Sequence, residues 1–354
     1  MNTSVLDRDA AADLRHRHAE LVAAEPRLRI RERAARLGAS EAQLVAAECG
    51  LTSTELAAEG DAPMQAIFRE LGTLGQVMAL SRNEWCVHER YGRYEDIQAG
   101  GPVGLVLGPD IDLRMFFTCW KYCYAVNEND RRSIQFFDKE GVAVHKVFVT
   151  DDTDAAAYDV LVARFAVRGA RNLPAVEPIA TGAEADQADD AAALRTAWLA
   201  MQDTHEFFPM LRKFKVSRLG ALAAAGSDLA QQVPNDTVET VLTRAAETAL
   251  SIMCFVGNRG IVQIHSGPVH KLVRTGPWYN VLDPKFNLHL NTSEIASTWI
   301  VNKPTSDGWV TSVEIYSASG ELIVQFFGER KPGKPELTAW RELLVGLAPQ
   351  PLAA

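Results

Sequence analysis

The pattern of hydrophobic and polar positions changes character several times along the chain. Residues 7–24 are rich in helix-forming Ala, Leu, Arg and Glu, and residues 28–38 and 39–48 continue the helical pattern. Gly38 followed by Ser40 is typical of a helix stop and a new N-cap. The first fifty residues therefore predict a long helix followed by a helix-turn-helix pair.

From about residue 75 the pattern switches to short β-rich runs separated by Gly, Asn and Asp. These runs predict an antiparallel meander. They cover residues 77–80, 85–88, 103–107, 133–137 and 142–149. Residues 152–166 then look helical, and residues 168–190, with two prolines and several acidic residues, have the composition of a linker.

The same order of segments, helical first and then β-rich, returns after the linker. Residues 191–224 are helical in pattern, and the chain closes with a helix at 336–345. Between them lie β-rich runs at residues 252–256, 260–265, 309–316 and 322–327.

The two β regions can be aligned on each other. Asn83 matches Asn258 and Gly92 matches Gly267, each 175 residues apart, as does the run 111–114 with 286–289. Further on, three matches are separated by 179 residues: Trp120 with Trp299, Ser133 with Ser312, and Gly141 with Gly320. Constant offsets indicate a duplicated unit, with four extra residues in the second copy between 289 and 299.

The predicted fold is therefore α+β with internal duplication. Each of two similar halves holds a large, mostly antiparallel β-sheet flanked by helices. The expected organisation is an N-terminal half at residues 1–167 (a helical hairpin plus a β-sheet unit), a linker at 168–190 and a C-terminal half at 191–354. The junction of two such halves is a natural place for a ligand cleft.

Charge and composition narrow the classes of function. Lys and Arg total 36 against 45 Asp and Glu, a net charge of −9. An acidic chain is a poor general binder of nucleic acid, because phosphate binding needs a basic face. DNA recognition by residues 28–48, supported by the arginines there, stays a minor alternative to a helical hairpin packed on a sheet.

The location expected from the sequence is the cytoplasm. The five cysteines are few, odd in number and scattered, which fits reduced thiols better than a disulfide framework. The N-terminal segment lacks the apolar core of a secretory signal, and no stretch approaches 18 uncharged apolar residues, so we expect no membrane span.

His205 has the most unusual surroundings of the eight histidines. It follows the linker directly and lies among Trp198, Phe207, Phe208 and Phe214. A neutral imidazole in an aromatic setting can act as an axial ligand for a flat, apolar macrocycle. The alternative is a hydrogen-bonded, partly buried histidine.

Other candidate chemistry is weaker. His265 and His270 flank a turn without a third ligand at recognisable spacing, and His205 lacks the second histidine that a protease-type zinc helix needs. Walker and dinucleotide-binding motifs are missing from the sequence. The cations Arg218, Lys303 and Arg330 interrupt an acidic chain and could hold carboxylates.

Taken together, four segments resemble a known family. They are residues 103–116, 203–211, 280–290 and 328–333. On these segments the chain resembles the bacterial haemin-degrading and haem-trafficking proteins of Gram-negative haem-uptake operons, of the HemS/HmuS/ChuS type. The resemblance covers nearly the whole chain, and it implies two similar halves with haem b, as ligand or substrate, between them.

The resemblance also implies roles for individual residues. His205 becomes the proximal ligand of the haem iron, and Arg114 and Phe116 lie over the distal face. Arg114 and His205 are the expected catalytic residues. The positions that hold the propionates or line the pocket are Arg218, Phe255, Lys303, Gln325 and Arg330. Some members carry a further histidine just after the ligand, whereas residues 206–210 here contain none.

Two functions follow from the resemblance. The protein accepts imported haem and degrades it to release iron, with an external electron donor, or it carries haem without catalysis to a separate haem oxygenase. The implied partners are haem, a haem ABC importer and a haem oxygenase, and nucleic acid is not expected.

Overall fold

The structure, a computed structural model, describes residues 3–168, 172–179, 185–331 and 333–354. They form two compact units. The first unit contains the described residues of Met1–Arg82 and Glu89–Ala180, together with Gly257–Gln263. The second contains Asn83–His88 and the described residues of Thr181–Val256 and Ile264–Ala354.

The first unit combines helices with two groups of antiparallel strands. Its helices are α1 (Thr3–Ala24), α2 (Ile30–Leu37), α3 (Glu41–Ala47), α4 (Pro63–Arg69) and α5 (Ala155–Phe165), with short 3-10 helices η1 (Glu70–Leu74) and η2 (Phe117–Cys119). Its strands are β1 (Ser53–Glu55), β2 (Gly75–Arg82), β4 (Ile97–Gln98), β5 (Val103–Leu107), β6 (Asp112–Phe116), β7 (Trp120–Glu128), β8 (Arg131–Asp138) and β9 (Ala143–Thr153). Five strands run in the order β1-β7-β8-β9-β2, and β4-β5-β6 form a meander.

The second unit repeats this arrangement. Its helices are α6 (Ala191–Leu199), η3 (Thr204–Glu206), α7 (Phe207–Phe214), α8 (Arg218–Ala225), α9 (Thr237–Thr248), η4 (Thr292–Glu294) and α10 (Thr338–Leu347). Its strands are β10 (Ala230–Val233), β11 (Ile252–Gly257), β13 (Leu272–Thr275), β14 (Trp278–Leu282), β15 (Phe286–Asn291), β16 (Ser297–Thr305), β17 (Gly308–Tyr316) and β18 (Leu322–Gly328). The order β10-β16-β17-β18-β11 and the meander β13-β14-β15 match the first unit strand for strand. The predicted fold class is confirmed.

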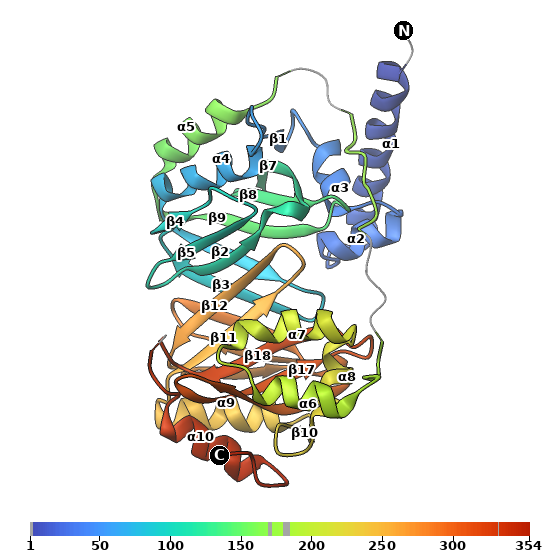
Figure 1. The fold of residues 1–354 in the computed structure, drawn as a ribbon. Helices are drawn as coiled ribbons and strands as arrows, with labels where there is room; N and C mark the ends of the chain where they lie inside the picture. Colours follow the sequence, from blue (N-terminus) through green and yellow to red (C-terminus); the bar gives the residue numbers. More distant parts are fainter. Residues whose placement is uncertain (1–2, 169–171, 180–184, 332) are drawn as a thin grey trace. The chain divides into compact units, whose positions relative to one another are not determined.

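Helices cover both faces of the five-stranded sheet in the second unit. Apolar side chains on one face of β11, β17 and β18 pack against Val238, Val241 and Leu242 of α9 and against Trp340 of α10. The opposite face packs against α6, α7 and α8, with Val301 and Tyr316 contributed by the sheet. In Figure 1, α7 is drawn on one side of β18 and β17, and α9 and α10 are drawn on the other. In the first unit, α4 and α5 cover one face and α1–α3 the other.

Each unit also includes a short segment from the other half of the chain: Gly257–Gln263 belongs to the first unit and Asn83–His88 to the second. Strands β3 (Cys86–Gly92) and β12 (Ile261–Gly267) are therefore divided between units. In the first unit, the Asn258 amide donates to the carbonyls of Arg82 and Val144, each at 2.9 Å, and Ile261 is fully buried. In the second, the Asn83 amide donates to the carbonyl of Ile323 at 2.7 Å. Asn83 and Asn258, matched by the sequence repeat, thus perform the same task.

Strand registers locate the difference between the two copies. The β-bulge between Phe136 and Phe137 recurs between Ile315 and Tyr316, 179 residues later. The turn glycines Gly141 and Gly320 share this offset and both have positive φ, 77° and 80°. The hairpin β8–β9 therefore corresponds to β17–β18 at a constant offset of 179.

The position expected for the four extra residues is wrong. Trp299 lies opposite Glu314, as Tyr124 lies opposite Gln135, so Trp299 corresponds to Tyr124 and not to Trp120. The offset is 175 on β16 and 179 on β17. The extra residues therefore lengthen the β16–β17 hairpin by two residue pairs instead of lying between 289 and 299.

The segment expected to be a linker is attached to both units where it is described. Residues 169–171 and 180–184 lie outside the described residues. The Tyr122 hydroxyl donates to the carbonyl of Ala175, and the Glu177 carboxylate accepts from Lys121. Ala185 forms a parallel bridge with Val216 of the second unit. The described part of this segment therefore follows the surface of each unit.

A buried histidine makes the stability of the first unit depend on acid pH. His145 lies between the Ser81 hydroxyl, 2.8 Å from Nδ1, and the Tyr94 hydroxyl, 2.5 Å from Nε2. Burial lowers the pKa of His145 to about 3, against a small opposing effect of the Leu80 backbone. Below pH 6.5 the His145 side chain binds a proton in the unfolded chain but stays neutral in the native state. The free energy of unfolding therefore decreases as the pH falls from 6.5 towards 3.

We expect the loss between pH 7 and pH 5 from this group to be about 2 kcal/mol, from 1.36 kcal/mol per pKa unit. His145→Gln keeps polar atoms near both hydroxyls but has no titrating ring, so its unfolding free energy should change less over this interval. Urea denaturation at the two pH values measures the difference. Equal pH dependence in both proteins would contradict the assignment.

Candidate functional site

His205 presents one ring nitrogen outward and has the other fixed by a carboxylate. The 3-10 helix η3 begins after Asp203, whose Oδ1 accepts from the His205 backbone N–H at 2.8 Å and lies 2.6 Å from Nδ1. An ionised carboxylate only accepts hydrogen bonds, so Nδ1 carries the proton and the neutral ring keeps a lone pair on Nε2. The side chain is 92% exposed, which leaves Nε2 accessible to a ligand.

Asp203 is held in its ionised form. The hydrogen bond from the His205 backbone lowers the pKa of Asp203; partial burial opposes this, and the His205 ring and the charge of Arg330 add to the lowering. A carboxylate that accepts from the second ring nitrogen orients a ligating histidine and makes it more basic. The Asp203–His205 pair therefore has the geometry of a metal-ligating imidazole with its supporting acceptor.

Aromatic rings follow His205 directly on α7. Phe207 is buried and meets Trp198 edge to face, with ring centroids 4.8 Å apart. Phe208, one residue further along, is 60% exposed. The helix thus fixes one ring in the core and offers the next to an apolar ligand beside His205.

A fully buried carboxylate collects three of the predicted site residues. Glu314 on β17 is 0% exposed. It accepts from Arg218 Nε and Nη2, both at 2.8 Å, from Lys303 Nζ at 2.7 Å and from Gln325 Nε2 at 2.9 Å. The Tyr316 hydroxyl, at 2.6 Å, and the Ser312 hydroxyl, at 3.0 Å, complete the set. We name these six residues the Glu314 cluster.

The Glu314 cluster carries two positive charges and one negative charge. Burial opposes ionisation of Glu314, but Arg218 and Lys303 outweigh it and hold its pKa well below the usual range. For Lys303, burial and the neighbouring Arg218 outweigh the attraction of Glu314 and lower the pKa to about 8. Lys303 therefore stays protonated at neutral pH, and the cluster has a net charge of +1.

The cations of the cluster lie against the aromatic rings that follow His205. Lys303 Nζ is 4.5 Å and the Arg218 guanidinium 5.0 Å from the centroid of Phe207, and Arg218 is 5.5 Å from Phe208. Cation–π contacts of this kind strengthen when they are desolvated. The cluster thus ties the His205-bearing segment to the sheet.

Phe255 and Arg330 lie in the same unit. Phe255 on β11 is opposite Gln325, which is opposite Glu314, and its ring is 5.0 Å from that of Phe327. Arg330 follows β18 and pairs with Asp307 of the β16–β17 turn at 3.5 Å.

The lengthened β16–β17 hairpin brings Asp307 into this position. The neighbouring Ser306 backbone donates to the carbonyl of Gln202 at 2.9 Å, next to Asp203. The hairpin extension, present only in the second copy, therefore supports the loop that carries His205.

Arg114 and Phe116 belong to the first unit, on strand β6. Arg114 pairs with Asp112 and also donates to the carbonyl of Leu113 at 3.1 Å. Phe116 is opposite Val103 of β5, and both are exposed. This face of the hairpin thus carries one guanidinium among apolar side chains.

The matching positions of the first unit hold a different set of charges. Gln135 stands where the second unit has Glu314, and Lys146 where it has Gln325. Glu41, the first residue of α3 after the Ser40 cap, pairs with Lys146 at 3.4 Å, whereas Arg218 follows the Ser217 cap of α8. Glu128 stands where the second unit has Lys303, at the offset of 175, and adds a second carboxylate, so the net positive cluster is a feature of the second unit.

The remaining histidines do not form a metal site. Among residues 3–168, 172–179, 185–331 and 333–354, no group of three or more His, Cys, Asp or Glu is arranged to hold a metal ion. His265 stacks on Phe286 at 3.8 Å, and His289 Nδ1 meets Asn280 Oδ1 at 2.7 Å.

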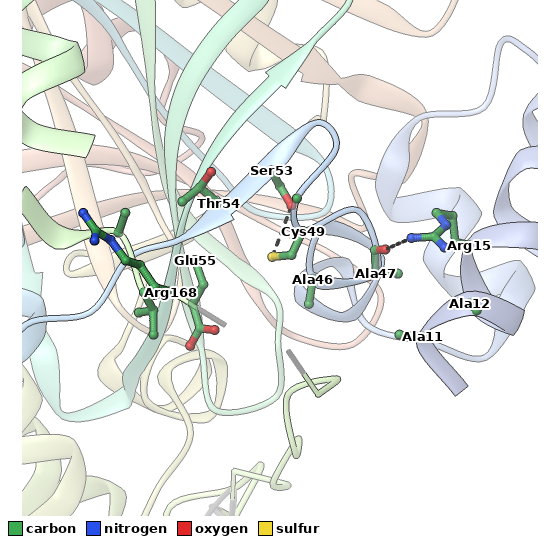
Figure 2. Close-up of a pocket in the computed structure, with 13 residues that line it drawn as sticks. Ala11, Ala12, Arg15, Ala46, Ala47, Cys49, Ser53, Thr54, Glu55 and Arg168 are labelled. Atoms are coloured by element: carbon green, nitrogen blue, oxygen red, sulfur yellow. Dashed lines mark hydrogen bonds between the residues drawn. The ribbon is translucent and has the colours of Figure 1, made fainter. Parts of the chain in front are cut away.

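The first unit contains a cavity of about 610 Å³, and its lining includes none of the predicted site residues. Figure 2 shows it between α1, α3, β1 and the segment that follows α5. Arg15, Cys49, Glu55 and Arg168 line it together with small residues. Neither imidazole nor aromatic rings occur among the described residues of its lining, so it lacks what a macrocycle requires.

The helix-turn-helix pair has the predicted local geometry, but its second helix, α3, is too deeply buried to contact DNA. Gly38 is in the left-handed region, and the Ser40 hydroxyl caps α3. Six of the seven residues of α3 are buried, and the Gln43 amide donates to the carbonyl of Pro174. A recognition helix must expose a face to base edges, so α3 cannot serve as one in this conformation.

Comparison with known proteins identifies the family. A family model described as the haemin-degrading HemS.ChuX domain matches residues 38–165 and 215–347. The hemin transport protein HmuS of Yersinia pestis is 38% identical over 97% of this chain and 99% of its own. The chain belongs to this haemin-degrading HemS/ChuX family.

Solved structures of the same kind cover the whole chain. Apo-PhuS, a heme-binding protein from Pseudomonas aeruginosa, superposes with a TM-score of 0.91 and 46% identity over 95% of this chain and 99% of its own. The heme degrading enzyme ChuS of Escherichia coli O157:H7 gives 0.89 and 35% identity over 96% and 100%. Within the part of the chain that the structure describes, no helix is long and apolar enough to cross a membrane.

Asp203 offers a direct test of the geometry around His205. We expect Asp203→Ala to weaken ferric haem binding about tenfold, while the histidine-ligated spectrum persists. The reason is that loss of the acceptor that orients a ligating histidine costs about 10- to 100-fold in comparable metal sites. Titration followed at the Soret band measures it. Glu206→Gln, a change next to the ring that breaks no hydrogen bond of His205, is the matched control. Equal loss in both variants would contradict a specific role of Asp203.

Proposed function

We propose that this protein binds haem b through Nε2 of His205 and degrades it to release iron. The observation that carries the proposal is the Asp203–His205 pair, in which Asp203 occupies Nδ1 of a side chain that is 92% exposed, with the exposed Phe208 three residues further along the chain. Iron that arrives within a macrocycle needs only one or two ligands from the protein. The names of the relatives, which include heme-binding and heme degrading proteins, support it.

The chain supplies the other interactions that haem requires. Burial of the ring is the main driving force, and Phe208 and Phe255 offer apolar surface for it. The two propionates need cations where they lose water, and Arg218, Lys303 and Arg330 are the proposed partners. Gln325 adds an amide to the same group.

For Arg114 and Phe116 the proposal rests on the family resemblance. Arg114 would donate a hydrogen bond to a small ligand of the iron, and Phe116 would supply an aromatic surface. A positioned guanidinium stabilises charge that develops on such a ligand. Both a carrier and a degrading enzyme can use this arrangement.

The second candidate is a haem carrier. ChuS is described as a heme degrading enzyme and a heme oxygenase, PhuS as a heme-binding protein and HmuS as a hemin transport protein. In either role we propose that the protein works in the cytoplasm with a haem ABC importer, and as a carrier it would deliver haem to a haem oxygenase.

One experiment separates the two functions. The purified haem complex receives an excess of ascorbate as reductant in air, with catalase present to remove free peroxide, and the Soret band is followed. Degradation predicts loss of the band with release of iron and an open-chain tetrapyrrole. A persistent band, with haem passed on intact when apo-haem oxygenase is added, would establish the carrier and overturn degradation.

A further inference from the structure

Glu314 has no place in the chemistry described above, although it accepts six hydrogen bonds from five side chains. Oε1 accepts from Arg218, Lys303, Ser312 and Gln325, and Oε2 from Arg218 and Tyr316. A carboxylate offers about four lone-pair sites, so these donors saturate it. Glu314 can therefore neither bind a ligand nor exchange a proton with one.

The cations around it still have donors to spare. Among the described residues, Lys303 Nζ hydrogen-bonds only to Glu314 and uses one of its three N–H groups. Arg218 uses Nε and Nη2 and keeps the donors of Nη1. Lys303 is 4% and Arg218 13% exposed, so neither side chain extends into solvent.

Two neighbouring cations do not stay together in a buried place without a counter-charge. The first unit shows the contrast at matching positions, because Gln135 replaces Glu314 and the helix-start residue is Glu41 in place of Arg218. Among these matched positions, all of them described residues, those of the second unit place two cations around one carboxylate and those of the first unit do not.

We propose that Glu314 is the positioning residue of an anion site, which holds Arg218 and Lys303 side by side so that both meet one carboxylate of the ligand. This inference rests on the proposed function, in which that carboxylate is a haem propionate. Glu314 acts through the two cations and does not touch the ligand. The net charge of +1 can neutralise a single carboxylate. In this proposal the second propionate pairs with Arg330.

The test compares ferric haem with its dimethyl ester, which keeps the ring and the iron but lacks both carboxylates. For each protein the measured quantity is the ratio of the two dissociation constants. We expect the wild-type protein to favour the free acid at least tenfold, and Glu314→Gln to reduce this preference at least fivefold while the histidine-ligated spectrum of the ester complex stays unchanged. Glu41→Gln breaks the matching ion pair of the first unit and should leave the ratio at the wild-type value.

The direction of the change distinguishes positioning from simple charge. At a pH low enough to keep Lys303 protonated in both proteins, Glu314→Gln raises the net charge of the cluster, so a site that works by charge alone would favour the acid more strongly. A raised or unchanged ratio in a folded Glu314→Gln protein overturns the inference, while the wild-type preference keeps the proposed function standing. If the wild-type protein itself shows no preference, the propionate pairing fails and the inference fails with it.

Tyr316→Phe provides a second variant if Glu314→Gln does not fold. It removes one hydroxyl that contacts both Glu314 Oε2 and Arg218 Nε and keeps the buried ring. We expect a two- to threefold reduction of the acid-over-ester ratio. No reduction in this folded variant would overturn the inference equally.

Discussion

Replacing His205 by alanine is expected to weaken ferric haem binding by about 100-fold or more. Loss of a residue that only orients a ligating histidine already costs about 10- to 100-fold, and His205 is the proposed ligand itself. What binding remains comes from burial of the ring, so haem would still associate but with a changed ferric spectrum.

Two controls make this result specific. His270→Ala removes another exposed histidine of the same unit and should bind haem as the wild-type protein does. Added imidazole should restore the histidine-type spectrum of His205→Ala, because it can occupy the vacated coordination position. An unchanged spectrum and affinity in His205→Ala would remove His205 as the ligand.

The second large effect is expected at the cations of the Glu314 cluster. A charge-assisted hydrogen bond to a desolvated carboxylate contributes about 1.5–3 kcal/mol, which is roughly 10- to 150-fold in affinity. We expect Arg218→Ala and Lys303→Met each to weaken haem binding within that range, with the axial spectrum preserved.

The same variants should lose stability. Removing one partner of a buried ion pair leaves the other uncompensated, at a cost of about 3–5 kcal/mol. Arg218 has the larger expected effect, because it forms two of the hydrogen bonds to Glu314. Chemical denaturation measures this loss, and haem titration at a temperature where each variant is folded measures affinity.

Lys334→Ala is the matched control, because Lys334 is exposed and lies four residues beyond Arg330. It should change neither affinity nor stability. If Arg218→Ala and Lys303→Met were as impaired toward the dimethyl ester as toward haem, these side chains would act through the fold and not through the propionates.

Much of this fold could be predicted because the signals are local. The alternation in residues 142–149 or 322–327 predicts strands, and the Gly38–Ser40 pair predicts the turn between α2 and α3. Repeated turn residues, such as Gly141 and Gly320, also predicted the shared topology. His205 could be selected because its aromatic neighbours are adjacent in sequence.

The features that sequence reasoning missed depend on strand register. Glu314 lies 96 residues from Arg218 and 11 from Lys303, and only the pairing of β16, β17 and β18 brings them together. One signal was present: Ser312, Glu314 and Tyr316 alternate on one face of a strand whose other face carries Val313 and Ile315. A carboxylate in the middle of such a strand predicts a buried partner.

The misplaced insertion has the same origin. Matching one tryptophan to another gave an offset, but the residues opposite each tryptophan across the sheet decide equivalence. Likewise, the exchange of Asn83–His88 and Gly257–Gln263 between units left no mark in local composition. Which helix face is buried also depends on tertiary packing, so the burial of α3 could not be inferred from its sequence.

The central claim is that His205 Nε2 ligates the haem iron, and pulsed electron paramagnetic resonance of the ferric complex tests it most directly. Protein carrying isotopically labelled histidine should show a strong hyperfine coupling from one labelled axial nitrogen, and the same coupling should persist in His270→Ala. We predict that it disappears in His205→Ala at full haem occupancy. Persistence of the coupling in His205→Ala would contradict the account and assign the iron to another histidine.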